Sequence, residues 1–230
     1  MFIDPLYLIM LIPGLLLAGW ASLKVKSTFA KYSHVRSSRG LTGAETARQI
    51  LRRNGIYDVH VEETQGMLSD HYDPRSKVVR LSPQVYREPS VASMAIAAHE
   101  VGHALQHARG YTPLALRSAA VPLAQLGSYA PWIIMIGGFL LHVLELVYLG
   151  VALFSVTVIF QLVTLPVEFN ASSRAKIQLA EMGVVSGADA RGVTKVLSAA
   201  AMTYVAAAVT AIMTLLYYLL RLGLIGNRDE

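Results

Sequence analysis

The apolar tract AAVPLAQLGSYAPWIIMIGGFLLHVLELVYLGVALFSVTVIFQLVTL covers residues 119–165 and decides the fold. A helix crosses a bilayer with about 20 residues, so these 47 residues are too many for one crossing and suit two. His142 and Glu145 are its only acidic, basic or imidazole residues. Because charged groups are costly at the bilayer centre, we expect the turn there. The tract therefore predicts membrane-spanning helices at 119–141 and 146–165.

Two further segments are apolar enough to span a membrane. The first, LYLIMLIPGLLLAGWASLKV, covers residues 6–25. No basic residue precedes it and no A-x-A cleavage site follows it, which favours a retained anchor over a cleaved signal peptide. The second covers residues 200–222 and carries Tyr217 and Tyr218 near one end, where an aromatic belt would lie.

The composition agrees with a polytopic membrane protein. Hydrophobic residues make up 54% of the 230 residues, charged residues only 15%, and the mean hydropathy is +0.46. Such a chain has too little polar surface for an ordinary soluble domain, and it is too apolar to be disordered. The absence of cysteine excludes disulfide frameworks, thiolate metal sites and cysteine nucleophiles.

The distribution of positive charge predicts the topology. Fourteen of the 20 Lys and Arg residues lie between the first two spans, and four lie in 166–199. The other two lie on the opposite side of the membrane in this arrangement. Positive residues concentrate on the cytoplasmic side, so both larger loops are expected in the cytoplasm of a multi-pass cell-membrane protein. The net charge of +5 is thus explained by topology and by contact with anionic lipid, rather than by nucleic-acid binding.

The segment 26–118 has the signals of a small α+β domain. Thr42, followed by Glu45, forms a capping box that opens a helix ended by Gly55. Turn and breaker residues then predict strands at 58–63 and 77–81. A second helix is expected at 91–108, ended by Gly110.

This second helix contains AIAAHEVGHALQHARGY, in which His99, Glu100 and His103 form an H-E-x-x-H motif. The two histidines lie one turn apart on one face, so their imidazoles can share a metal ion. Glu100 is rotated by about 100° from His99 and lies beside the open position of the metal. There it can act as the general base toward a water molecule that the metal activates.

A catalytic zinc site needs a third protein ligand. The metzincin pattern fails, because Gln106 and Arg109 stand where it requires Gly and His. His107 lies one further turn along the same helix, and three imidazoles on one straight helix cannot converge on one ion. His107 is therefore expected near the site or exposed.

The other route to a third ligand is a carboxylate from a second helix. Glu168, in TLPVEFNASSRA, lies just beyond the third span. If the chain crosses the membrane twice between Arg117 and Pro166, Glu168 is on the same side of the membrane as the H-E-x-x-H motif. The alternatives are that Glu168 only pairs with Arg174 at the interface, or that Glu181 is the ligand.

Three separated runs resemble the YugP-like neutral zinc metallopeptidases of bacterial membranes: DHYDPRSKVVRLSPQVY, HEVGHALQHARGY and LPVEFNASSRA. The resemblance implies a gluzincin-type site in which His99, His103 and Glu168 hold one Zn²⁺ per chain and Glu100 is the general base. The chain is more distantly similar to the CAAX-processing and stress-protease group, whose third ligand begins an E-x-x-x-D motif. Ser172 stands at the position of that Asp, so Asn170 is expected to accept from the other N–H of a ligand imidazole.

Residues outside the motif have both a functional and a structural interpretation. His71 or Tyr72 could donate to the oxyanion of the tetrahedral intermediate, or the strand that follows them could pair with an extended substrate. The structural alternative is a turn in which Asx residues satisfy their own backbone. Arg174 could steady the same oxyanion or contact a phospholipid.

Together these features predict a mainly α polytopic protein with about four transmembrane helices and a small α+β, zincin-like cytoplasmic domain. The predicted function is a membrane-embedded zinc endopeptidase acting on peptide or protein substrates, membrane proteins among them, at the cytoplasmic face. One alternative is an intramembrane protease of the site-2 type. Another is a metal-binding scaffold or sensor without hydrolytic activity. A His, His, carboxylate set accepts several divalent ions, so zinc is inferred from ligand type.

Overall fold

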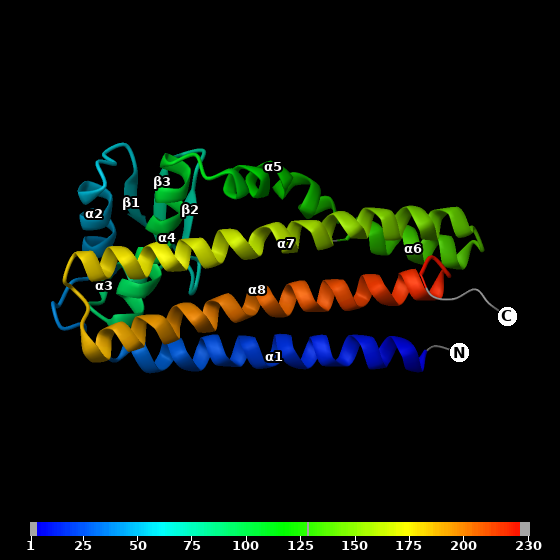
Figure 1. Ribbon diagram of the computed structural model, residues 1–230, viewed down its shortest axis with the longest axis horizontal. Coiled ribbons are helices and arrows are strands. Elements are labelled where there is room, and N and C mark those ends of the chain that lie inside the picture. The colour runs from blue at the N-terminus through cyan, green and yellow to red at the C-terminus, as the bar shows by residue number, and fades with distance from the viewer. Residues whose placement is uncertain (1–3, 128, 226–230) are drawn as a thin grey trace. The chain divides into compact units, whose positions relative to one another are not determined.

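The computed structural model describes residues 4–127 and 129–225, and Figure 1 shows that most of this chain is helical. The chain divides into two compact units, which are described separately. The first comprises Met1–Ala21, Leu116–Leu165 and Thr203–Glu230, and the second comprises Ser22–Ala115 and Pro166–Met202. Three long helices contribute residues to both units: α1 (Pro5–Ser33), α7 (Leu144–Glu181) and α8 (Gly187–Arg221).

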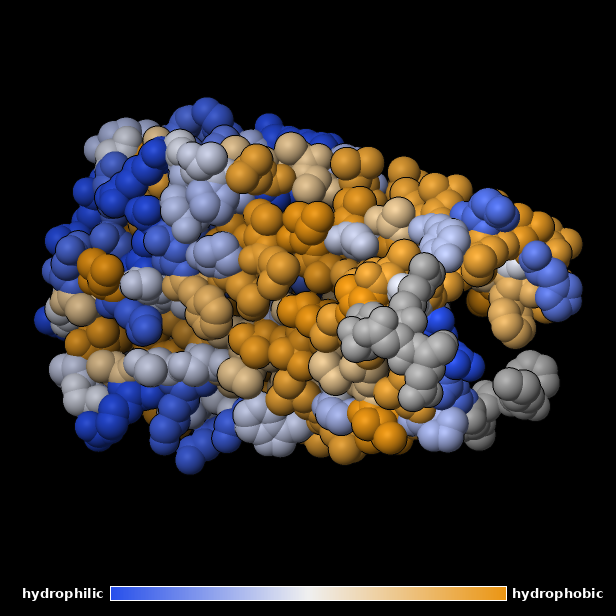
Figure 2. Space-filling model, turned by 45° about the vertical axis from the view of Figure 1, so that its right-hand side comes forward, coloured by the Kyte–Doolittle hydropathy of each residue, from blue (hydrophilic) through white to orange (hydrophobic). Residues whose placement is uncertain are grey.

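The first unit exposes an extensive apolar surface. In the described residues, four helical stretches are long and apolar enough to cross a membrane: α1, α7, α8 and the stretch Thr112–Leu140. Large apolar side chains such as Leu16, Ile133 and Phe139 are about two thirds exposed or more (69%, 67% and 72%). Figure 2 shows broad areas of this orange, hydrophobic surface. A surface of this kind is stable against lipid and unstable in water.

The helices of the first unit differ in their bounds from those expected. The turn near His142 is confirmed, since α6 (Ala130–Leu140) ends before it, α7 begins at Leu144, and His142 has a φ of +55°. The helix expected at 119–141 instead forms two helices, α5 (Thr112–Gly127) and α6, with Pro131 in the first turn of α6. A proline there starts a new helix, because it has no N–H to donate to the preceding turn.

Two other helices continue well beyond their apolar residues. The segment 166–199 is expected as a cytoplasmic segment that carries the third metal ligand; in the structure α7 runs on to Glu181 and α8 already begins at Gly187. Hydropathy reports only where a helix meets lipid, and a helix continues into polar sequence as long as its side chains find partners there. The second unit is therefore partly built from extensions of these helices.

The second unit contains a three-stranded sheet in the order β1-β3-β2. The expected strands are present as β1 (His60–Glu63) and β3 (Val78–Leu81), which pair in parallel. The strand β2 (His71–Asp73) was not expected; it pairs antiparallel with β3. The polar sequence of β2 is typical of a turn. A strand at an exposed edge of a sheet does not require alternating apolar and polar residues, so the pattern gave no strand signal. Since β3 is the central strand with a neighbour on each side, it cannot pair with a substrate, which was one of the functional alternatives. Within the described residues, β2 is an edge strand of this sheet.

Helices pack on this sheet around an apolar core. They are α2 (Gly43–Arg53), α3 (Pro83–Arg87) and α4 (Val91–Ala108). The capping box at the start of α2 is confirmed: the Thr42 hydroxyl accepts from the Glu45 N–H (3.2 Å), and the Glu45 carboxylate accepts from the Thr42 N–H (2.8 Å). The largest fully buried apolar side chains of this core come from six elements and are Ile50, Val79, Leu81, Val85, Val91, Met94, Val101, Leu105, Leu179 and Val193.

Candidate metal centre

The helix α4 carries the H-E-x-x-H motif and is fixed at both ends. The Ser90 side chain caps its start by accepting from the Ser93 N–H at 3.1 Å. It ends at Ala108, and Gly110 leaves the helical path with a φ of +61°, which glycine adopts at little cost. Most of its residues are buried, because alanine and glycine let neighbouring elements approach on nearly every side. The motif is therefore held on a buried, well-anchored helix.

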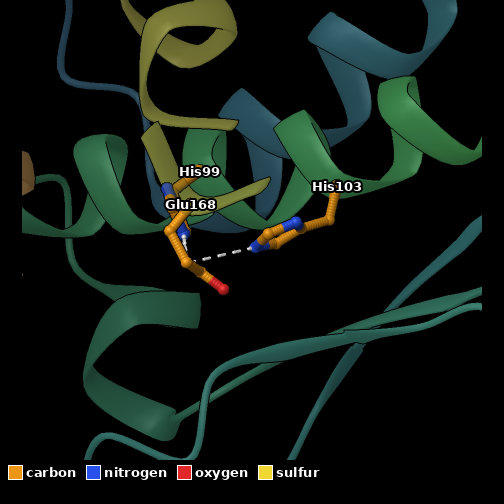
Figure 3. Close-up of side chains that lie close together, drawn as sticks. All are labelled: His99, His103 and Glu168. Carbon is orange, nitrogen blue, oxygen red and sulfur yellow. Dashed lines mark hydrogen bonds and ion pairs between the residues drawn. The ribbon is translucent and has the colours of Figure 1, made fainter. Parts of the chain in front are cut away.

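The structure brings His99, His103 and Glu168 together, although Glu168 is 65 residues from the nearer histidine. Nε2 of His99 lies 3.2 Å from Glu168 Oε2, and Nε2 of His103 lies 3.6 Å from the same oxygen. Figure 3 shows both imidazoles directed at the carboxylate. The two rings are nearly perpendicular, at 84°. Three potential ligand atoms thus converge from two helices.

This donor set fits a zinc ion. Tetrahedral zinc with bonds of about 2.0–2.1 Å separates its ligand atoms by about 3.4 Å. The 3.2 and 3.6 Å contacts match that separation, and all three ligand atoms lie within 4.8 Å of one another. The side chains are also largely removed from water, at 13%, 9% and 3% exposure for His99, His103 and Glu168. Borderline nitrogen and hard oxygen donors in such a cluster are typical of zinc.

Glu100 lies beside this group and is itself buried. Within residues 4–127 and 129–225, its carboxylate takes part in no hydrogen bond or ion pair. Its charge still acts on two neighbours. Burial disfavours the charged form of His103, but the Glu168 hydrogen bond and the Glu100 charge together outweigh it and raise the pKa of His103. Burial, reinforced by the Glu100 charge, raises the pKa of Asp70. Glu100 is thus close to the three potential metal ligands, and its carboxylate oxygens form no hydrogen bond or ion pair within the described residues.

The second ring nitrogens of the two histidines have different partners from the one expected. Nδ1 of His99 lies 3.1 Å from the Ser172 hydroxyl, and Nδ1 of His103 lies 3.0 Å from Oε1 of Gln106. The prediction that Asn170 accepts from an imidazole is wrong, because its Oδ1 accepts from Gln106 (3.0 Å) and Arg174 (2.7 Å) instead. Ser172 is four residues from Glu168 and shares its helix face, whereas Asn170 is two residues away and does not.

The sequence interpretation missed Gln106 and Ser172 as partners of the imidazoles. The available signal was spacing: Gln106 follows His103 by three residues, and Ser172 follows Glu168 by four, both of which place side chains on one helix face.

The remaining candidates have hydrogen-bond partners of their own. The Tyr72 hydroxyl lies 2.8 Å from His107 Nδ1, so these two pair with each other, and burial raises the pKa of Tyr72 to about 12. Arg174 donates to Asn170, and its guanidinium lies 5.9 Å from the centre of the Tyr111 ring.

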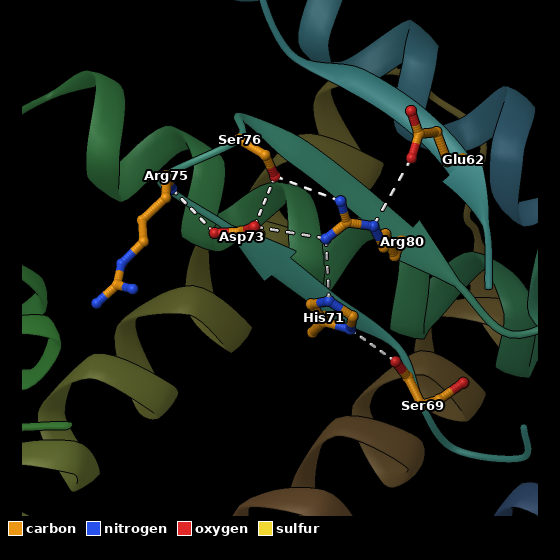
Figure 4. A network of polar contacts seen from close by, with 7 residues as sticks. All are labelled: Glu62, Ser69, His71, Asp73, Arg75, Ser76 and Arg80. Carbon is orange, nitrogen blue, oxygen red and sulfur yellow. Dashed lines mark hydrogen bonds and ion pairs between the residues drawn. The ribbon is translucent and has the colours of Figure 1, made fainter. Parts of the chain in front are cut away.

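His71 belongs to a polar network on the sheet (Figure 4). Its Nδ1 lies 2.8 Å from the Ser69 carbonyl, and its Nε2 lies 3.5 Å from Arg80. Hydrogen bonds from Ser76 and the Arg75 N–H lower the pKa of Asp73 in the same network to about 2. This network orders the turn between β2 and β3, so the structural interpretation accounts for His71.

Comparison with known proteins bears on the whole chain. Residues 7–223 match a family described as "Putative neutral zinc metallopeptidase". The chain is also 50% identical over 225 residues to "Putative membrane protease YugP" of Bacillus subtilis (strain 168), covering 98% of this chain and 99% of that protein. No solved structure matches. With nearly its full length matched by the family and by this relative, the chain belongs to the neutral zinc metallopeptidase family.

Proposed function

We propose that the protein is a membrane-embedded, zinc-dependent endopeptidase in which His99, His103 and Glu168 hold one Zn²⁺. The observation that carries the proposal is the convergence of both Nε2 atoms on Glu168 Oε2, at 3.2 and 3.6 Å, beside the unengaged Glu100 carboxylate. A bound zinc ion lowers the pKa of water and polarises a carbonyl oxygen. A site that only binds metal for stability has no need of a free carboxylate at position 100.

Glu100 is the general base in this proposal. Its carboxylate takes a proton from the attacking water while the oxygen of that water bonds to the scissile carbonyl carbon. The resulting carboxylic acid then donates the proton to the nitrogen of the leaving amine as the C–N bond breaks.

An extended peptide is the substrate class that suits the second unit. The strand β2 is at the edge of the sheet, so its outward N–H and C=O groups are available to an added strand. Since β2 also packs against α4, such a peptide would run close to the helix that carries the motif. The charge distribution places this unit on the cytoplasmic side of the cell membrane in our proposal.

The test is hydrolysis of casein by the detergent-purified protein and its Glu100→Gln variant, with bound zinc measured in both. We expect Glu100→Gln to lose activity by about 10²- to 10⁴-fold, because an amide cannot accept the proton, while it retains zinc. Glu88→Gln, an exposed glutamate at the end of α3, is the matched control and should keep full activity.

Two results would count against the proposal. Equal activity in the wild type and Glu100→Gln would show that Glu100 is not the general base. A wild type that binds zinc and hydrolyses neither casein nor membrane-protein fragments would favour the metal-binding scaffold.

A further inference from the structure

We infer that Gln106 is a positioning residue that fixes the His103 ring with its Nδ1 protonated and its Nε2 directed at the metal position. The inference rests on the proposed function, since it assigns a role around the same metal centre. It concerns a residue that stands three positions past the motif and touches no substrate.

Gln106 is fully buried and all three of its polar contacts are short. Its Oε1 lies 3.0 Å from His103 Nδ1, and its Nε2 donates to the Val167 carbonyl at 2.8 Å and to Asn170 Oδ1 at 3.0 Å. A buried amide in this position has both N–H groups and its carbonyl satisfied. Few side chains other than glutamine could replace it without leaving a buried polar group unpaired.

The neighbours determine which end of the Gln106 amide faces His103. The Val167 carbonyl can only accept, so the amide nitrogen must face it. Asn170 Oδ1 also accepts, because it is held by the Arg174 Nε–H at 2.7 Å, and a guanidinium only donates. Two independent acceptors therefore orient the nitrogen of Gln106 away from His103, and the carbonyl oxygen faces the ring.

This orientation decides the tautomer of His103. A carbonyl oxygen cannot donate, so the proton must be on His103 Nδ1. The neutral ring then has its lone pair on Nε2, the atom that faces Glu168. A metal ligand needs that lone pair, and an Nδ1–H bond to a carbonyl also makes the ligand nitrogen more basic. Arg174 and Gln106 both donate to Asn170 Oδ1, and His103 Nδ1 donates to Gln106 Oε1, so the donor and the acceptor are fixed in each hydrogen bond from Arg174 to His103.

The same side chain ties the two ligand-bearing helices together. Val167 directly precedes Glu168 on α7, and Gln106 is on α4, so its bond to the Val167 carbonyl holds the backbone beside the third ligand. His99 has no comparable constraint. The Ser172 hydroxyl at its Nδ1 can rotate and either donate or accept, so it does not select a tautomer. We therefore expect Gln106 to matter more for metal binding than Ser172.

The test compares zinc affinity and the Co²⁺ absorption spectrum of the full-length protein in detergent. In Gln106→Met, which keeps the side-chain length but loses the carbonyl, we expect zinc to bind about 10- to 100-fold more weakly and the d–d bands of the Co²⁺ form to shift. Ser172→Ala should lose less zinc affinity than Gln106→Met.

Gln178→Met is the matched control. Gln178 is also a buried glutamine on a ligand-bearing helix, but its contacts are to Asn54 (2.6 Å) and Glu181 (3.1 Å), away from the imidazoles. Its substitution should lower the unfolding temperature and leave zinc affinity and the Co²⁺ spectrum unchanged. Equal weakening in both methionine variants would overturn the inference, because it would show a general loosening.

Further results keep the inference separable from the proposed function. If Gln106→Met does not fold, Asn170→Ala removes one of the acceptors that orient Gln106 and should give a smaller loss of zinc affinity with a shifted Co²⁺ spectrum. If the folded variants keep the zinc affinity and the Co²⁺ spectrum of the wild type, the role of Gln106 is overturned, and the metal site itself is not. A wild type that binds no zinc would instead overturn the metal site itself.

Discussion

The imidazoles of His99 and His103 differ in how strictly their neighbours hold them. His103 faces a carbonyl whose orientation is fixed by two acceptors, while His99 faces a hydroxyl that rotates. An aspartate at the position of Ser172 would carry a charge. Here both partners of the imidazoles are neutral. Glu100, whose charge acts on His103, takes part in no hydrogen bond or ion pair within the described residues.

Asp70 gives a residue-scale prediction about pH. It accepts from the Ser82 N–H at 2.7 Å, yet burial raises its pKa. The folded protein therefore binds more protons here than the unfolded chain, so this group makes the protein less stable as pH rises from about 4, the usual pKa of Asp. We expect Asp70→Asn to gain stability relative to the wild type as pH rises toward 7. The measurement is the unfolding temperature of both proteins from pH 4 to pH 7.

Asp58→Asn is the control with the opposite sign. A hydrogen bond from Lys77 lowers the pKa of Asp58, so its stabilisation is present above its unfolded pKa and is lost as pH falls. This variant should become less stable relative to the wild type as pH rises through the acidic range. A pH-independent difference between Asp70→Asn and the wild type would contradict the assignment of a raised pKa to Asp70.

At the scale of elements, the site depends on the close approach of α4 and α7. A Cβ added at Gly102, inside the motif, would lie 2.6 Å from the Ala171 carbonyl oxygen on α7. That oxygen belongs to the backbone and cannot move aside as a flexible side chain can. The glycine between Glu100 and His103 therefore sets the distance at which the two histidines meet Glu168.

We expect Gly102→Ala to destabilise the protein by about 1–3 kcal/mol, the usual cost of overpacking, and to weaken zinc binding as well. Gly137→Ala on α6 is the control, because a Cβ there meets nothing within 4 Å and should stabilise the helix by up to about 1 kcal/mol. Thermal unfolding and zinc titration of both variants provide the measurement. Normal zinc affinity in Gly102→Ala would show that the spacing of α4 and α7 does not control the site.

At the scale of the whole molecule, our proposed arrangement in the membrane rests on the distribution of positive charge. Eighteen Lys and Arg residues belong to the two segments 24–117 and 166–199, against two elsewhere. In our proposal, two crossings lie between these segments, by the stretch Thr112–Leu140 and by α7, and they return the two segments to one side. The proposed metal centre draws His99 and Glu168 from those same segments, so it requires them to share a side.

The absence of cysteine makes this arrangement directly testable by labelling single introduced cysteines. Tyr57, 78% exposed in the second unit, and Leu141, 68% exposed in the turn between α6 and α7, are suitable positions. In intact cells, a membrane-impermeant maleimide should label Leu141→Cys and leave Tyr57→Cys unlabelled until the cells are opened. Labelling of Tyr57→Cys alone in intact cells would reverse the proposed topology.

The sequence by itself determined the features that depend on neighbouring residues. Hydropathy over about 20 residues locates the membrane-length helices, the Thr42–Glu45 pair starts α2, and the spacing of His99 and His103 places two imidazoles on one face. These are local effects of backbone geometry and side-chain chemistry, so a linear sequence is enough to predict them.

Only the tertiary structure decided the features that join distant segments. It placed Glu168 beside the imidazoles, gave His103 the carbonyl of Gln106 rather than the amide of Asn170, and made the polar residues His71–Asp73 an edge strand. Each depends on which helix face or strand edge remains available after packing. Packing between segments that are tens of residues apart decides which side chains come within hydrogen-bond reach. Local propensity depends only on neighbouring residues, so it cannot predict these pairs.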